Sequence, residues 1–531
     1  MQALLQPLSK LGEYEEIKNR IEKNRGILQL AGCIDSQKAH VIYGLGQEKK
    51  NRLVIAENEL KAKELYEDLK FYYPDVFYYP ARDLIFFEAD IHGNLLTKQR
   101  MQVIAALLEK KSVTVVTSIS GCMDYLLPIS VLKKHVLHFK NDSVLDTEAL
   151  KKELINMGFE YNAQAEAPGQ FAMRGGIVDI FLLTEENPVR IEMWGDEIDS
   201  IRSFDAESQR SIENLDEITI YPAEEMVLDD SVLEKGLVSI EKERDKTIQA
   251  FRDAFLPEEA GRIKNMVKEA VSAMREFHDF SSAEHFIRYF YKEPVTFLDY
   301  FEEEDTLLFL DETNHLLASV EAVETEFRES MKHRLEKGYL LAGQTDLLCG
   351  KKLLIHKINQ KNGIGICTME QQKEDWQIND SFYLTTKSVN SYNNSFELLV
   401  KDLKNWKKRG YQVLLLSGSR TRAKRLAQDL LNEGLTAVYT EDRNREIHEG
   451  EIVTTYGYAR SGFEYPMVRF VLITESDIFG KEKKKKRKKT EYSGKKIQSF
   501  SELSIGDYVV HENHGLGIYR GIEKVTVDKV V

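Results

Sequence analysis

A glycine-started loop near the N-terminus carries residue types that could bind a nucleotide phosphate. The apolar run Ile27–Ala31 precedes Gly32, and Lys38 follows six residues later. Strand, glycine, lysine and helix come in this order in phosphate-binding loops, whose pattern is G-x-x-x-x-G-K-[ST]. Gln37 stands where the pattern has its second glycine, and Ala39 stands where it has the hydroxyl that holds magnesium. We interpret the loop as a nucleotide site that has lost its chemistry. An ordinary strand-to-helix connection that never bound nucleotide fits the same residues.

Two adjacent carboxylates form the second motif with chemical potential. The apolar run from residue 306 to 310 ends in Asp311 and Glu312. In a working nucleotide-driven motor such a pair binds magnesium and positions water. Because the phosphate loop is degenerate, we instead expect both carboxylates to cap the helix that starts near Asn314. The sequence therefore predicts no catalytic residues.

The stretch from residue 169 to 205 is predicted to form four short strands separated by turn residues. Apolar residues at every second position give each strand one apolar face. Arg174, Arg190 and Trp194 fall on the opposite face, and Arg and Trp are the residue types that dominate binding hot spots. A single surface tryptophan covered by an arginine stem is the alternative interpretation.

Composition limits the possible functions. The 531 residues suffice for three or four domains, and 42% hydrophobic with 30% charged residues is ordinary for a globular protein. A net charge of −14 excludes a chain that coats DNA along its whole surface. The sequence has no apolar run that could span a membrane and no secretory signal, so we expect a cytoplasmic protein.

Cysteine and histidine positions argue against a metal site. The four cysteines are too far apart in sequence for paired metal-ligand spacing, and we expect reduced thiols. His511 and His514 flank a turn without cysteine or histidine partners nearby, so we predict no metal there either. The run 481–489 is almost entirely basic and reads as a solvated linker that could touch DNA weakly.

The segments RGGIVDIF and RIEMWGDEIDSIRSFD, at this spacing, resemble the module shared by excision-nuclease component B and the bacterial transcription-repair coupling factor. That resemblance implies a docking surface for excision-nuclease component A, and the family's docking residues fall on Arg174, Arg190 and Trp194. The segment 504–521 resembles the opening of the small β-barrel by which the coupling factor grips RNA polymerase. The loop 81–94 is too short for the long hairpin of component B, which favours the coupling factor.

The resemblance implies a multidomain α/β architecture in which a degenerate helicase-like domain is split around a small α+β docking module. A second small α/β domain, a basic linker and the start of a small β-barrel follow. The expected boundaries are 1–124 and 219–350 for the split domain, 125–218 for the docking module, 351–395 for a linker, 396–480 for the second α/β domain, 481–500 for the basic linker and 501–531 for the truncated barrel.

The resemblance also implies what this part of the protein does. We expect a non-catalytic recruitment and autoregulatory half without cofactors, whose parent protein carries an ATP- and magnesium-dependent DNA translocase beyond residue 531. The implied partners are excision-nuclease component A, the β subunit of RNA polymerase through the completed barrel, and DNA mainly through the motor. The alternatives are a damage-verifying ATPase of the component B type and a transcription regulator built around the barrel.

Overall fold

Within the described residues, the computed structural model contains a seven-stranded sheet, two six-stranded sheets and two strand pairs, connected by helices. The structure describes residues 2–23, 26–82, 94–109, 111–276, 279–280, 282–371, 375–442, 444–480, 508–511 and 515–518.

The largest sheet is parallel throughout, in the order β15-β1-β14-β13-β2-β4-β3. Its inner strands are buried on both faces, which is why they read as continuous apolar runs rather than as alternating ones. Leu53 and Ile55 face one core, whereas Val54 faces another. The strands are β1 (Ile27–Ala31), β2 (Asn51–Ala56), β3 (Val76–Tyr79), β4 (Thr114–Ser118), β13 (Thr306–Asp311), β14 (Gly363–Ile366) and β15 (Ile378–Tyr383).

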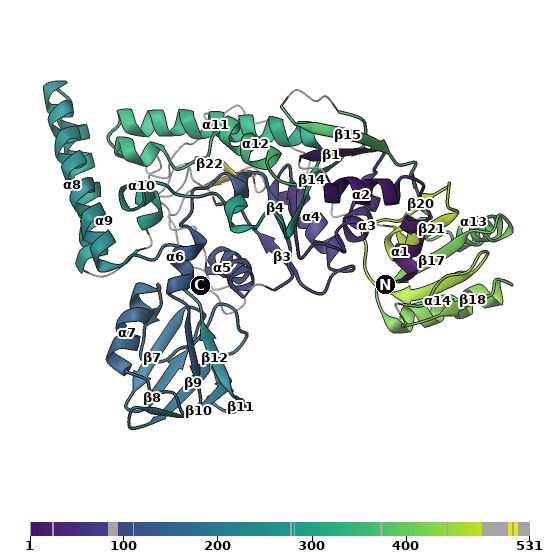
Figure 1. Cartoon of the computed structure of the whole chain (residues 1–531), viewed down its shortest axis with the longest axis horizontal. Coiled ribbons are helices and arrows are strands. Elements are labelled where there is room, and N and C mark those ends of the chain that lie inside the picture. The colour runs from purple at the N-terminus through teal and green to yellow at the C-terminus, as the bar shows by residue number, and fades with distance from the viewer. Residues whose placement is uncertain are drawn as a thin grey trace.

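Helices cover both faces of this sheet, and local signals fix several of their ends (Figure 1). The side chain of Asn58, for example, accepts a hydrogen bond from the amide of Lys61 and so starts the helix that follows β2. These helices are α1 (Gln2–Ser9), α2 (Tyr14–Lys23), α3 (Asp35–Leu45), α4 (Glu59–Leu69), α5 (Asn94–Leu108), α11 (Thr313–Glu336) and α12 (Lys351–Asn359).

The predicted linker at 351–395 is wrong. Helix α12 and strands β14 and β15 lie within it, and β14 is inserted between β1 and β13. Glycine makes this strand possible, since a Cβ added at Gly365 would meet the Thr313 side chain at 2.8 Å. The split α/β domain therefore does not end at residue 350, because its sheet uses residues up to Tyr383.

A smaller module is inserted between β4 and β13 of the large sheet. It contains a six-stranded sheet in the order β11-β10-β9-β8-β7-β6 and a separate pair formed by β12 and β5. Figure 1 shows it below the left part of the large sheet. Its elements are α6 (Ile129–Lys134), β5 (Leu137–Lys140), α7 (Thr147–Asn156), β6 (Glu160–Tyr161), β7 (Gln170–Arg174), β8 (Ile177–Ile180), β9 (Val189–Trp194), β10 (Glu197–Phe204), β11 (Ser211–Leu215) and β12 (Glu217–Ile220).

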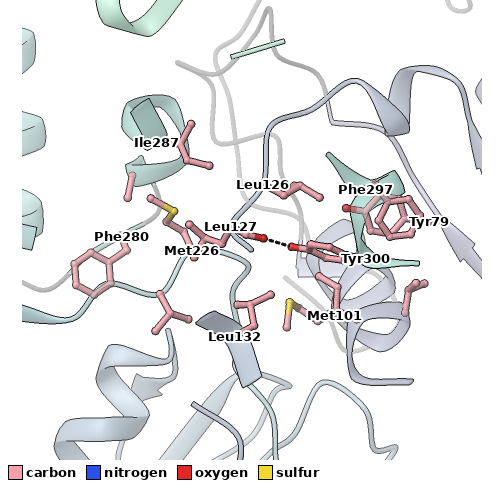
Figure 2. Packing of buried hydrophobic residues seen from close by; sticks show 14 of the residues in the cluster. Tyr79, Met101, Leu126, Leu127, Leu132, Met226, Phe280, Ile287, Phe297 and Tyr300 are labelled. Atoms are coloured by element: carbon pink, nitrogen blue, oxygen red, sulfur yellow. Dashed lines mark hydrogen bonds between the residues drawn. The ribbon is translucent and has the colours of Figure 1, made fainter. Parts of the chain in front are cut away.

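Buried charges and apolar side chains fix this module to the large-sheet body. The fully buried Arg100 lies 2.5 Å from a carboxylate oxygen of Glu225 and 3.4 Å from Asp124. Asp124 lies where the chain enters the module, and Glu225 lies where it leaves. Burial raises the pKa of Asp124 to about 6, although Arg100 opposes the shift. Beside them the hydroxyl of Tyr300 donates to the carbonyl of Leu127 at 2.6 Å (Figure 2). The junction is therefore a packed interface.

A long helical hairpin follows the inserted module. Helices α8 (Asp230–Asp253) and α9 (Pro257–Glu276) pack along each other and form one end of the molecule in Figure 1. Ile240 and Ile263 lie in the hairpin's buried seam. Shorter elements lead back to the large sheet: η2 (Ala283–Phe286), α10 (Ile287–Phe290) and η3 (Phe297–Tyr300).

The third sheet has the order β16-β20-β21-β17-β19-β18 and shares a core with the N-terminal helices. One face packs against α13 and α14, whereas Leu414 and Leu416 on the other face share a core with Leu4 and Leu8 of α1. The elements are β16 (Lys387–Ser388), α13 (Phe396–Lys408), β17 (Gln412–Ser417), α14 (Arg420–Asn432), β18 (Ala437–Tyr439), β19 (Ile452–Tyr456), β20 (Phe463–Tyr465), β21 (Phe470–Thr474) and α15 (Glu475–Phe479).

The C-terminal region is described only in part. Strands β22 (Tyr508–His511) and β23 (Gly515–Ile518) pair antiparallel within the predicted barrel segment 501–531. The predicted basic linker 481–500 and His514 lie outside the described residues, as does most of the loop 81–94.

Candidate functional site

Strand register places the three predicted docking residues on one face of the six-stranded sheet. Asp179 on β8 is opposite Ala172 on β7 and opposite Arg190 on β9. Arg174 and Trp194 lie an even number of residues away along their strands, and therefore on the same face. Trp194 is 86% exposed. We call this surface, formed by Arg174, Asp179, Arg190 and Trp194, the arginine–tryptophan face.

Asp179 orders both arginines of this face, and the sequence reasoning did not identify it. Its buried carboxylate accepts hydrogen bonds from Arg174 at 2.8 Å and from Arg190 at 2.6 and 2.9 Å. The hydrogen bond to Asp179, which exceeds the opposing cost of burial, raises the pKa of the Arg190 guanidinium. Gln209 accepts a further bond from Arg190 at 2.8 Å. The signal in the sequence was an aspartate inside an apolar strand, opposite an arginine in the next strand.

The two arginines differ in what they still offer a partner. Arg190 is only 12% exposed, and its guanidinium lies 4.3 Å from the ring centroid of Phe204. Arg174 is about half exposed and has one internal carboxylate contact, with Asp179. On this face the exposed indole can fill an apolar pocket of a partner, and the ordered arginine can donate a charged hydrogen bond to an acidic group.

The second candidate site, the loop from Gly32 to Ala39, is closed. Gly32 has φ +81°, and a Cβ there would meet the carbonyl oxygen of Leu384 at 2.1 Å. The glycine is therefore needed for the close approach of residue 384 and not for a phosphate. Helix α3 already begins at Asp35, and the amide of Gln37 donates to the carbonyl of Ile34. The amides of Gly32 and Cys33 donate to the carbonyls of Thr368 and Cys367, so three backbone amides of the loop are already used within the protein.

Lys38 is held by three carboxylates. Its ammonium lies 2.6 Å from Asp311, 2.9 Å from Glu312 and 3.0 Å from Asp35, and the side chain is 2% exposed. Burial opposes the positive charge, but Asp311 and Glu312 outweigh this cost and raise the pKa of Lys38. The lysine that would contact phosphate in an active loop therefore keeps its positive charge, but the three carboxylates of the protein balance that charge.

The expectation that Asp311 and Glu312 cap the following helix is wrong. Glu312 occupies the N-cap position of α11 with φ +54°, and its side chain makes no capping hydrogen bond. It accepts bonds from Lys38 and from Thr368, while the amide of Asn314, in the first turn of α11, donates to Gln371. Attraction to the buried lysine determines where both carboxylates point.

Gln37 and His40 contact the third sheet through Tyr465 of β20. The side chain of Gln37 donates to the hydroxyl of Tyr465 at 3.0 Å. His40 Nε2 lies 2.7 Å from the carbonyl of Leu4, which can only accept, so Nε2 carries the proton and Nδ1 accepts from Tyr465 at 3.0 Å. The degenerate loop is now part of a joint between two sheets.

This joint predicts acid sensitivity. Burial lowers the pKa of His40 to about 4, although the bond to Leu4 opposes the shift. The unfolded chain takes up this proton near pH 6.5, so His40's contribution is complete above that value and is lost as the pH falls toward 4, by about 3 kcal/mol. We expect His40→Gln to flatten the fall of the Tm between pH 6.5 and 4. Parallel Tm curves for variant and wild type would contradict this.

The described residues offer neither a metal centre nor a membrane span. No group of three or more His, Cys, Asp or Glu side chains in the described ranges is placed to hold a metal ion. No helix in this part of the chain is both long and apolar enough to cross a bilayer. All four cysteines are buried and unpaired by disulfides.

Comparison with known proteins gives two family matches. Residues 137–226, which include the whole arginine–tryptophan face, match the UvrB interaction domain. Residues 503–531 match the CarD-like/TRCF RID domain. The transcription-repair-coupling factor of Bacillus subtilis (strain 168) is 28% identical over 98% of this chain and 44% of its own length. This chain is related to the transcription-repair-coupling factors.

A second coupling factor, from Staphylococcus haemolyticus, is 28% identical over 91% of the chain and 41% of its own length. The chain thus spans less than half the length of these coupling factors. The resemblance carried by RGGIVDIF and RIEMWGDEIDSIRSFD is confirmed, and the alternative of a component B type protein is not favoured.

Proposed function

We propose that this chain is a non-catalytic recruitment part of a transcription-repair coupling factor, and that its arginine–tryptophan face docks excision-nuclease component A. One observation carries the proposal: a tryptophan exposed to 86% lies on the same sheet face as two arginines ordered by a buried aspartate, within the segment that matches the UvrB interaction domain. Aromatic and arginine side chains of this kind are common interface anchors.

The test is a binding measurement between the purified chain and purified excision-nuclease component A. We expect saturable binding that weakens when Trp194 is truncated, while folding is unaffected. Absence of binding by the folded wild-type chain would contradict the proposal.

The remaining roles of the parent protein follow from the same relationship. We propose that the completed domain beginning near residue 503 binds the β subunit of RNA polymerase, and that an ATP- and magnesium-dependent motor outside this chain translocates on DNA. Under this proposal the large sheet is a degenerate helicase-like domain split around the docking module. The second α/β domain, predicted as 396–480, rests on it and begins at residue 387, because β16 belongs to its sheet.

Because carboxylates already balance the charge of Lys38, we predict that the chain neither binds ATP at micromolar concentration nor hydrolyses it. A triphosphate approaching Lys38 would face the carboxylates of Asp35, Asp311 and Glu312. Isothermal titration with ATP and magnesium should therefore give no saturable heat. Saturable heat that disappears in Lys38→Ala would instead support an ATPase of the component B type.

A further inference from the structure

Three exposed lysines form a row along one side of helix α13. Lys401, Lys404 and Lys408 are three and four residues apart, so they are neighbours on the helix surface. Within the described residues, none of the three has a carboxylate at ion-pair distance. The aspartate of this helix, Asp402, instead accepts a hydrogen bond from the hydroxyl of Tyr392 at 3.2 Å. We call Lys401, Lys404 and Lys408 the lysine row.

Helix α14 extends this basic surface. Leu403 of α13 and Leu426 of α14 lie in one buried core with Val413 of β17, so both helices cover the same face of the third sheet. Their opposite sides therefore point to solvent. Figure 1 shows the two helices at the end of the molecule opposite the α8–α9 hairpin. The exposed cations of α14 are Arg420, Arg422, Lys424 and Arg425.

The charge of these two helices differs from that of the rest of the chain. Together α13 and α14 carry eight Lys and Arg residues against three Asp and Glu residues. The hairpin helices α8 and α9 carry nine against ten, and the whole chain has a net charge of −14. Like charges three and four residues apart slightly destabilise a helix. Helix stability therefore does not explain the lysine row, and the charge favours a polyanionic partner.

The geometry of the surface favours duplex DNA as this polyanion. From Lys401 to Lys408 the row extends about 10 Å along the helix axis. Duplex DNA presents about six phosphate charges over this length. Proteins that bind single strands also stack bases on aromatic side chains. Neither helix exposes such a ring, because Trp406 is buried, Phe396 packs against the core and α14 has no aromatic residue.

We propose that the outer surface of α13 and α14 binds the phosphate backbone of double-stranded DNA, through the lysine row and the cations of α14. Lysine is a flexible point charge that attracts phosphate, and contacts to phosphate carry no information about base sequence. Because the surface is a local basic region on an acidic chain, binding is weak and strongly salt dependent. The inference is independent of docking at the arginine–tryptophan face, which belongs to another sheet.

Titration of a fluorescent DNA duplex with the full chain, at salt concentrations from about 50 to 200 mM, tests the proposal. The test variant combines Lys401→Gln, Lys404→Gln and Lys408→Gln. We expect it to bind about tenfold more weakly at the lowest salt, and to lower the slope of log affinity against log salt by about three, one for each lost phosphate contact. All three positions are exposed and glutamine is a good helix former, so the Tm should not change.

A matched variant controls for net charge. Changing Lys235, Lys242 and Lys246 of α8 to glutamine alters the charge of the chain equally at three exposed positions, and should leave the affinity and the slope unchanged. An equal loss of affinity in both variants would show an effect of net charge alone and would overturn the proposal. Absence of saturable binding by the wild-type chain at the lowest salt would also overturn it.

Two further measurements test other sources of binding. In the first, the lysines at 483–486 of the basic run are changed to glutamine. Binding lost in this variant but unchanged in the α13 variant would assign the DNA contact to the run and overturn the proposal. In the second, a single-stranded RNA of the same sequence replaces the duplex. Tighter binding of that RNA than of the duplex would show that an unpaired strand is the preferred partner, with the same consequence.

Discussion

Truncating Trp194 to alanine is expected to weaken binding of excision-nuclease component A by about thirtyfold. This corresponds to about 2 kcal/mol, the loss typical of an aromatic interface anchor. Because 86% of the residue is exposed in the free chain, the substitution removes little intramolecular packing, and the Tm should not change. Binding and melting measured on the same protein preparation check both statements. A lowered Tm with unchanged affinity would show that Trp194 is structural.

The arginines of the same face need a different comparison. Arg190→Ala would leave the buried carboxylate of Asp179 with Arg174 alone, so we expect a loss of stability as well as of affinity. Arg174→Ala is the cleaner variant, since its side chain is about half exposed and Arg190 still pairs with Asp179. Affinity lost in Arg174→Ala at unchanged Tm would separate partner contact from folding.

Replacing Lys38 by methionine should lower stability more than any substitution on the arginine–tryptophan face. The change leaves the nearly buried carboxylates of Asp311 and Glu312 without their cation, and breaking a buried ion pair costs about 3 to 5 kcal/mol. Calorimetric unfolding measures the effect. A Tm equal to that of the wild type would show that Lys38 is not needed to stabilise the three carboxylates.

Two further variants control this measurement. Lys61→Ala removes a partly exposed lysine that pairs with Asp35 at 2.8 Å, and should cost about 1 kcal/mol or less. Combining Lys38→Met with Asp311→Leu should recover part of the lost stability, because an apolar pair can replace a buried ion pair. Additive losses in the double variant would contradict the coupling.

The strands of the arginine–tryptophan face were predictable because their signals are local. Alternation and turn residues define β7 to β10 within a few dozen residues, and their face follows from strand parity. The exposure of Trp194 follows in the same way. Likewise, Gln37 and Ala39 identify a degenerate loop without any knowledge of tertiary contacts.

Long-range contacts explain what the sequence did not reveal. Strand β14 has four residues, two of them glycine, and only its two neighbours give it a place in the sheet. His40 meets Tyr465 across 425 positions of sequence. The role of Asp179 depends on the strand register, which places Arg190 opposite it.

The strand order of the large sheet has a consequence for synthesis on the ribosome. Strand β1 ends at Ala31, yet its two neighbours are β14 and β15, which end more than 300 residues later, at Ile366 and Tyr383. At roughly 5 to 20 residues per second, this apolar strand waits on the order of twenty seconds to a minute for either neighbour. Chaperone binding during translation would therefore protect residues 27–31. Slower translation lengthens the wait, so we expect it to increase aggregation of the nascent chain. Refolding of the complete chain has no such wait and should cause less aggregation.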